Sequence, residues 1–400
     1  MSAGRPHKCT VSYAIDKLNQ GEILSELENT EIESIPEESE DSYSNDDIYN
    51  ITSWGADLSF RELITMYDEE ELIKPELQRH YVWAKVEASR FVESLLLGLP
   101  VPSIFLANTS EDQKLIVDGY QRIMTVYDFV KGIWSKDGRV FRLSNSDKLN
   151  ERWRGKSFGE LSSAEQRKLR STTIHAIIFD QAKPKEGDTS LYQIFERINT
   201  GGRALGAQEI RNCVYQGKLN SLLIEINKDE NWRHFVGQDL DSRMRDMEFI
   251  LRFLALNTDH IKNAPKGNVS LKKLLNEYMG CKTNNTDYAI NTQRAVFIST
   301  IEFIKDNVGD SAFYNIVAGE PGKIRKRFYP TIFDSLMVAT AIAIEKLGAD
   351  IPTDTLEAKR LDILQNEDFR KYISEGTMQT ESIHGRISLL LEGLYGIQYI

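Results

Sequence analysis

Residues 114–126 read Lys-Leu-Ile-Val-Asp-Gly-Tyr-Gln-Arg-Ile-Met-Thr-Val, an expected strand that passes directly into an expected helix. The run Lys114–Val117 is rich in apolar and β-branched residues, which is typical of a strand. From Ile123 onward, apolar residues recur at helical spacing. A strand that turns at once into a helix presents unpaired backbone N–H groups and the positive end of the helix dipole at one point. Such a point binds phosphate or carboxylate groups, so the pattern predicts an anion site at residues 118–122.

The side chains at this junction suit a phosphate ligand. Asp118 ends the strand, where its carboxylate can hold a metal ion or orient water. Gln121 and Arg122 fall in the first helical turn, and a guanidinium can bind two phosphate oxygens at once. The alternative is that Asp118-Gly119 forms a plain turn and that Arg122 is a solvated helix residue. The pentapeptide by itself leaves both interpretations open.

Two further segments place polar side chains beside turn residues. Gln78-Arg79 lies between Pro75 and an aromatic pair, where it could also be a surface turn. Residues 195–205 read Phe-Glu-Arg-Ile-Asn-Thr-Gly-Gly-Arg-Ala-Leu, and glycines of this kind suit the left-handed end of a helix. A plain connector between two helices would explain them equally well. Together with residues 118–122, however, these segments supply the side chains of an anion or nucleotide pocket.

The whole chain is expected to be an α+β protein in three parts. Residues 1–50 form an acidic arm whose Ser/Glu/Asp/Asn-rich stretch cannot bury enough apolar area to fold, so we expect it to be largely disordered. Residues 51–215 mix helices with strands, and residues 216–400 are helical in pattern. The expected elements include a helix from Phe60, a hairpin over 103–107 and 114–117, strands over 139–143 and 172–179, and helices over 86–97, 161–170, 189–198, 206–216, 219–227, 244–257, 269–279, 290–306, 311–318, 330–347, 353–364 and 383–394.

The charge is concentrated in one stretch. The formal net charge is 49 − 60 = −11, and residues 21–50 contain 11 acidic residues with no Lys or Arg. The rest of the chain is therefore balanced, and the overall charge does not exclude nucleic-acid binding. We interpret residues 21–50 as a linker, with a partner-docking or DNA-mimicking arm as the alternative.

The composition also narrows the class of protein. No apolar run approaches the roughly 18–20 residues of a membrane span, and the first residues lack the apolar core of a signal peptide. Three widely separated cysteines give neither a disulfide framework nor a zinc knuckle. We therefore expect a cytoplasmic protein without membrane contact.

The order of these motifs resembles the N-terminal domain family of GmrSD-type restriction endonucleases, which belongs with the ParB/sulfiredoxin-like fold. The resemblance covers roughly residues 58–215 and continues into Met244–Leu254. It is carried by four motifs: Pro75-x-x-Gln78-Arg79-x-Tyr81-Val82-Trp83, Val92-Glu93-Ser94-Leu95-x(2)-Gly98-x-Pro100-x-Pro102, Val117-Asp118-Gly119-x-Gln121-Arg122 and Phe195-Glu196-Arg197-Ile198-Asn199-Thr200-Gly201-Gly202.

The resemblance implies a nucleotide-binding, NTP-hydrolysing component of a bacterial anti-phage or restriction-type defence system that uses an NTP with Mg²⁺. Asp118, Gln121 and Arg122 would be catalytic, with Asp118 also a metal ligand. The residues implied to bind nucleotide are Gln78, Arg79, Gly119, Tyr120, Asn199, Thr200 and Gly201.

One residue departs from the family signature Asp-Gly-Gln-Gln-Arg, because Tyr120 stands at its third position. Tyr120 could stack on a nucleotide ring, or it could pack against the sheet. Its presence also leaves a second function open, namely a non-catalytic sensor or adaptor that binds nucleotide, modified DNA or a partner protein.

Family members often add a nuclease domain of the His-Asn-His type, which needs a histidine base near metal ligands. The C-terminal half offers only the isolated His234, His260 and His384, and the chain contains no Gly-x(4)-Gly-Lys-Ser/Thr loop. We interpret His175 as a core or sheet-face residue and not as a base. Two alternatives remain. Either a separate partner protein is the nuclease or other effector, or the protein acts without cleaving DNA.

A basic cluster makes DNA a possible partner. Residues 323–329 combine four basic side chains with two aromatic ones, a composition that can contact phosphates. A solvated basic turn is the alternative. The candidate nucleic-acid contacts are Lys323, Arg325, Lys326 and Arg327.

Overall fold

The structure is a computed structural model that describes residues 50–74, 81, 83–109, 112–183, 192, 196, 198, 206–241, 243–317, 320 and 323–399. Several predictions lie outside these residues: the arm before Asn50, most of the helix over 189–198, and the candidate ligands Gln78, Arg79, Asn199, Thr200 and Gly201. The described chain divides into two compact units. The first comprises residues 50–220 and 279–282, and the second comprises residues 221–278 and 283–399.

The first unit is built on a five-stranded mixed sheet. Its strands are β1 (Asn50–Ser59), β2 (Leu72–Ile73), β3 (Ile104–Asn108), β4 (Lys114–Asp118) and β5 (Thr173–Lys183), in the order β1-β5-β3-β4-β2. The pairs β1/β5 and β3/β4 are antiparallel, whereas β3/β5 and β2/β4 are parallel. This sheet confirms the α+β class and the predicted hairpin.

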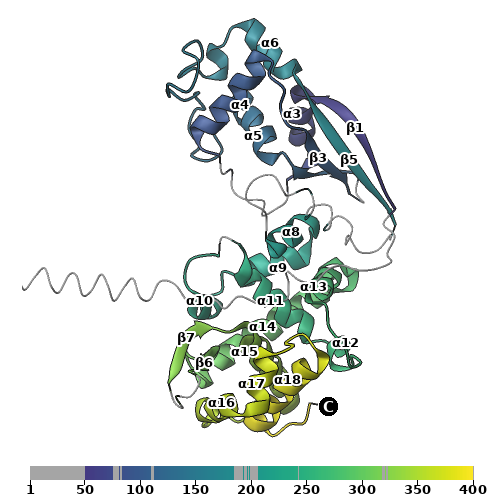
Figure 1. Ribbon diagram of the computed structural model, residues 1–400, viewed down its shortest axis with the longest axis vertical. Helices are drawn as coiled ribbons and strands as arrows, with labels where there is room; N and C mark the ends of the chain where they lie inside the picture. Colours follow the sequence, from purple (N-terminus) through teal and green to yellow (C-terminus); the bar gives the residue numbers. More distant parts are fainter. Residues whose placement is uncertain are drawn as a thin grey trace, which may run out of the picture. The chain divides into compact units, whose positions relative to one another are not determined.

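Four helices pack on one face of the sheet (Figure 1): α3 (Phe60–Asp68), α4 (Lys85–Leu97), α5 (Tyr120–Lys131) and α6 (Ser163–Ser171). They share an apolar core with the strands, in which Phe60, Val92, Ile116 and Phe129 are almost fully buried. Helix α3 begins at a capping box, since the Ser59 hydroxyl accepts a hydrogen bond from Glu62 N and the Glu62 carboxylate accepts one from Ser59 N. All four helices were predicted from the sequence.

One strand of this unit was not predicted, and one predicted strand does not form. The long strand β1 was missed, because residues 50–59 contain Gly55 and Asp57 and show no clean alternation of apolar and polar residues. Residues 139–143, predicted as a strand, make only isolated bridges, Val140 to Ile133 and Arg142 to Ser157. A 3₁₀ turn, Phe158–Glu160, and helix α8 (Ala207–Val214) complete the described elements of residues 50–217.

The second unit is mainly helical, as predicted. Helix α9 (Lys218–Ile226) spans the boundary between the units. Helix α13 (Leu271–Gly280) ends within residues 279–282, which are assigned to the first unit. The other helices are α10 (Glu230–Val236), α11 (Arg245–Leu256), α12 (Asp259–Lys262), α14 (Asp287–Asn307), α15 (Pro330–Leu347), α16 (Leu356–Gln365), α17 (Glu367–Ser374) and α18 (Thr380–Tyr395), with 3₁₀ turns at Lys282–Asn285 and Gly348–Asp350.

A short hairpin corrects the prediction that this unit is helical throughout. Strand β6 (Tyr314–Ile316) replaces the helix expected over 311–318, and β7 (Ile324–Phe328) contains most of the basic cluster that could have been a turn. Phe328 is fully buried and anchors the hairpin by packing against Phe249, Phe313 and Phe333. Burial of this one aromatic side chain outweighs the polar character of the strand.

Candidate functional site

The strand–helix junction forms as predicted, and Gly119 is required at its centre. Strand β4 ends at Asp118 and helix α5 begins at Tyr120, so Gly119 is the N-cap residue. Its φ of 99° lies in the left-handed region, where a side chain is strained. A Cβ at this position would also overlap the Ile104 side chain on the neighbouring strand. The N-terminal turn of α5 therefore begins directly beside the end of β4.

Arg122 and Asp118 form an ion pair across this glycine. The Arg122 guanidinium also donates from Nη1 to the carbonyl oxygens of Pro102 (2.9 Å) and Ser103 (2.8 Å), just before β3. The Arg122 side chain is 12% exposed, whereas that of Asp118 is 50% exposed. Arg122 therefore holds Asp118 and the loop before β3 together, while the carboxylate stays open to solvent.

The chain that follows Gln78-Arg79 is attached to helix α5. Trp83 N donates to Gln121 Oε1 (3.3 Å), and the Tyr81 hydroxyl is hydrogen-bonded to Thr125 Oγ1. Thr125 Oγ1 in turn donates to Gln121 O (2.6 Å). Two residues that follow Gln78-Arg79 closely in the chain, Tyr81 and Trp83, thus contact the first turns of α5.

The Tyr120 side chain packs against the core of the first unit, the second of its two predicted roles. It is half-buried and lies against the core shared by the helices and the sheet. Burial, with smaller contributions from Tyr67 and Asp128, raises the pKa of Tyr120 to about 12. Its hydroxyl is therefore protonated at neutral pH and can donate a hydrogen bond.

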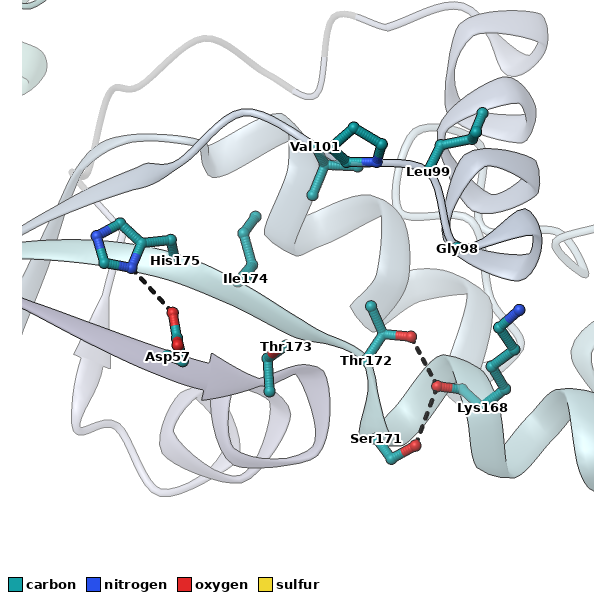
Figure 2. Close-up of a pocket in the computed structure, with 11 residues that line it drawn as sticks. Asp57, Gly98, Leu99, Val101, Lys168, Ser171, Thr172, Thr173, Ile174 and His175 are labelled. Atoms are coloured by element: carbon teal, nitrogen blue, oxygen red, sulfur yellow. Dashed lines mark hydrogen bonds and ion pairs between the residues drawn. The ribbon is translucent and has the colours of Figure 1, made fainter.

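An open pocket of about 530 Å³ lies along the loop that Arg122 holds. Figure 2 shows Leu99 and Val101 of this loop on one side, with His175 and Asp57 on strands β5 and β1. His175 Nδ1 lies 2.9 Å from Asp57 Oδ1, and both side chains are more than half exposed. His175 is thus on the sheet face, as predicted. Sequence reasoning missed its pairing with Asp57, because no local pattern shows which residues face each other across β1 and β5.

Helix α8 contains polar residues that the sequence did not single out. Gln208, Glu209, Arg211 and Asn212 are almost completely buried. Gln208 Nε2 donates to Asn212 Oδ1 (2.9 Å), and the Arg211 guanidinium lies 5.8 Å from the centre of the Tyr192 ring. The only available signal was the run of polar residues inside a helix that ends in Cys-Val.

The fit of Mg²⁺ to this site rests on Asp118. No group of three or more His, Cys, Asp or Glu side chains that could hold a metal ion occurs among the described residues. Mg²⁺ is commonly bound by one or two carboxylates together with substrate phosphates. The exposed carboxylate of Asp118 fits that arrangement, in which the nucleotide supplies the remaining ligands.

Three of the four basic residues of the cluster lie on strand β7 of the second unit, and Lys323 directly precedes this strand. Arg325 and Lys326 are exposed, and Arg327 is half-buried. Lys323 is exposed and forms an ion pair with Glu320 (2.9 Å). The strand therefore presents two of the four predicted contacts, Arg325 and Lys326, fully to solvent.

These features define an α+β domain in which a glycine-started helix follows an internal strand and a half-exposed carboxylate stands at the junction. Residues 60–216 match the family model described as GmrSD restriction endonuclease, N-terminal domain, and this part of the chain belongs to that family. No curated protein matches the chain. Among the described helices, none combines the length and apolar character needed to span a membrane.

Proposed function

We propose that the first unit binds a nucleoside triphosphate with Mg²⁺ and hydrolyses it, as a component of a restriction-type defence system. The observation that carries this proposal is the junction of β4, Gly119 and α5, where Asp118 and the start of a helix adjoin. The family match supports the defence context, because residues 60–216 include this junction. The phosphates would bind the N–H groups of the first turn of α5, whose positive end favours anions.

Each side chain at the junction has a role in this proposal. Asp118 orients the attacking water and accepts its proton as the water oxygen bonds to the γ-phosphorus and the bond to the β–γ bridging oxygen breaks. Arg122 fixes the Asp118 carboxylate and the loop before β3. Gln121, held by Trp83 N, completes the first turn. Bound Mg²⁺ would neutralise phosphate charge.

A second candidate function is a non-catalytic sensor or adaptor that binds nucleotide, modified DNA or a partner protein. The observation that favours it is the set of Arg122 contacts, because an ion pair and two carbonyl oxygens already engage this guanidinium without any ligand. Under this alternative the same residues would hold a nucleotide and release no phosphate.

Two further parts of the proposal concern partners. The exposed residues Arg325 and Lys326 on β7 would contact DNA phosphates. DNA cleavage would require a nuclease or other effector on another polypeptide.

Phosphate release from the purified full chain, measured with each of ATP, GTP, CTP and UTP in Mg²⁺, separates the two functions. We expect release with at least one nucleotide and its loss in Asp118→Asn. Asp112→Asn is the matched control, because Asp112 is an exposed carboxylate just before the opposite end of β4. Nucleotide binding without phosphate release would favour the sensor, and equal release by both variants would contradict the role of Asp118.

A further inference from the structure

We propose that the pocket beside the loop of residues 98–103 is the nucleoside-binding half of the same site. This inference rests on the proposed function, since it assigns the phosphates to the start of helix α5 and the base and ribose to the pocket. The pocket volume of about 530 Å³ lies within the range of roughly 300–1,000 Å³ that is usual for small-ligand sites.

The strand register places the two halves at one end of the sheet. Asp118 on β4 is opposite Phe105 on β3, and Phe105 is opposite Ile177 on β5. His175 precedes Ile177 by two residues on β5. With strands about 4.8 Å apart and about 3.3 Å per residue, the Cα atoms of Asp118 and His175 are about 12 Å apart. An extended nucleoside triphosphate can span such a distance.

One loop connects the two halves. Arg122 holds its end through the carbonyl oxygens of Pro102 and Ser103. The preceding residues, Gly98–Val101, line the pocket. The loop start is fixed as well, because Lys168 Nζ donates to Leu96 O (2.7 Å) at the end of α4. A ligand lying along this loop would have its phosphates near Arg122 and its base beside Leu99.

The lining of the pocket suits a nucleoside. Leu99, Pro100 and Val101 supply an apolar surface for the faces of a base. Asp57, Thr172, Thr173 and His175 supply polar groups for the base edge and the ribose hydroxyls. Leu99 is 52% exposed, which is costly for a leucine in water and is relieved when a ligand covers it.

Asp57 orients the ring of His175, because His175 Nδ1 and Asp57 Oδ1 are hydrogen-bonded at 2.9 Å. A histidine ring nitrogen can donate or accept a hydrogen bond. Nε2 can therefore pair with an amino, imino or carbonyl group of a base.

Gly55 makes room for the imidazole. A Cβ on Gly55 would lie 2.6 Å from His175 Cε1 and 2.9 Å from His175 Nε2. The backbone of Gly55 does not adopt a positive φ, so the approach of the ring is what requires glycine here. Glycine within a strand is otherwise unfavourable, and its presence on β1 supports a fixed position for this ring.

The experiment measures binding to the full chain by calorimetry, with Mg²⁺ and four probes: ATP, GTP, CTP and inorganic triphosphate. We expect His175→Ala and Leu99→Ala to weaken binding of at least one nucleotide about tenfold and to leave triphosphate binding unchanged. Gly55→Ala should act in the same direction, because it displaces the ring. Asp118→Asn and Arg122→Ala should change the affinity for nucleotide and triphosphate alike.

Two matched controls come from the same chain. Leu97→Ala removes a leucine that is also 52% exposed but does not line the pocket, and His260→Ala removes an exposed histidine of the second unit. Both should bind all probes like the unaltered chain. Nucleotide affinities unchanged by His175→Ala and Leu99→Ala, or lowered together with triphosphate affinity, would overturn the pocket assignment and leave the proposed function standing. Failure of the unaltered chain to bind any nucleotide or triphosphate would overturn both.

Discussion

Arg122 of helix α5 is ion-paired with Asp118 of strand β4, four residues earlier and across Gly119, and it also binds two carbonyl oxygens of the loop before β3. A single guanidinium thereby connects helix α5, strand β4 and the loop before β3. The half-exposed carboxylate of Asp118 is held at the point where the helix begins.

Arg122→Lys should destabilise the first unit although it keeps the charge. An ammonium cannot reproduce the planar fork that reaches Asp118 and two carbonyl oxygens together. We expect a loss of about 2 kcal/mol in the free energy of unfolding, the worth of one or two charge-assisted hydrogen bonds, measured by urea denaturation. Arg139→Lys is the control, because Arg139 is an exposed residue of the same unit. Equal stability of the two variants would contradict the connecting role of Arg122.

Gly119→Ala should be more destabilising than Gly132→Ala. Both glycines flank helix α5 and have positive φ values, 99° and 85°, so each substitution costs about 1–2 kcal/mol of backbone strain. Only Gly119 has a neighbour, the Ile104 side chain, that a Cβ would overlap, whereas Gly132 has nothing within 4 Å. The overlap should add about 1–3 kcal/mol. Thermal unfolding of the two variants checks this order, and a larger effect at Gly132 would contradict it.

Acid should weaken the start of helix α6 through Glu165. Hydrogen bonds from the Ser162 side chain and from Trp153 Nε1 lower the pKa of Glu165 to about 2 in the folded protein. A carboxyl whose pKa is lowered on folding contributes stability above its ordinary pKa of 4.5, and this contribution is lost as the pH falls from about 4.5 towards 2. Glu165→Gln should therefore unfold more easily at pH 7, and its difference from the unaltered chain should shrink near pH 2. A difference that is independent of pH would contradict the assignment.

The basic strand β7 is tested by DNA binding at several salt concentrations. The double variant Arg325→Ala/Lys326→Ala should bind duplex DNA more weakly, and its salt slope should fall by about two, since each lost phosphate contact contributes about 0.9. Arg370→Ala/Lys371→Ala is the matched control, because it removes the same adjacent pair of exposed residue types from α17. Fluorescence anisotropy gives both slopes, and identical slopes for the two variants would exclude β7 as the contact surface.

The helices and strands that were predicted correctly are those whose residue pattern lies within one short stretch of the sequence. Helices α3 and α4 follow from apolar spacing, and the hairpin of β3 and β4 follows from two apolar runs around a polar turn. Strand β1 was missed because its pairing with β5 joins residues more than 100 positions apart. Strand β7 was missed because only Phe328, at its end, is buried. In both cases tertiary contacts outweigh local composition.

The candidate site, too, was predictable only where the signal in the sequence is local. The sequence pointed to residues 118–122, because a strand, a glycine and a helix are adjacent there. It could not show that Arg122 binds the carbonyl oxygens of Pro102 and Ser103, nor that Asp57 faces His175. Those contacts depend on strand register and on loop position, which no short pattern encodes.

Hydrogen exchange of the backbone amides, followed by mass spectrometry, tests the central claim most directly. The full chain would be measured with and without Mg²⁺ and a non-hydrolysable nucleoside triphosphate. If phosphates bind the start of helix α5, amides of residues 119–123 should exchange more slowly with the nucleotide, while amides of the loop 135–138 should not change. Nucleotide binding that leaves exchange at residues 119–123 unaltered would contradict the account.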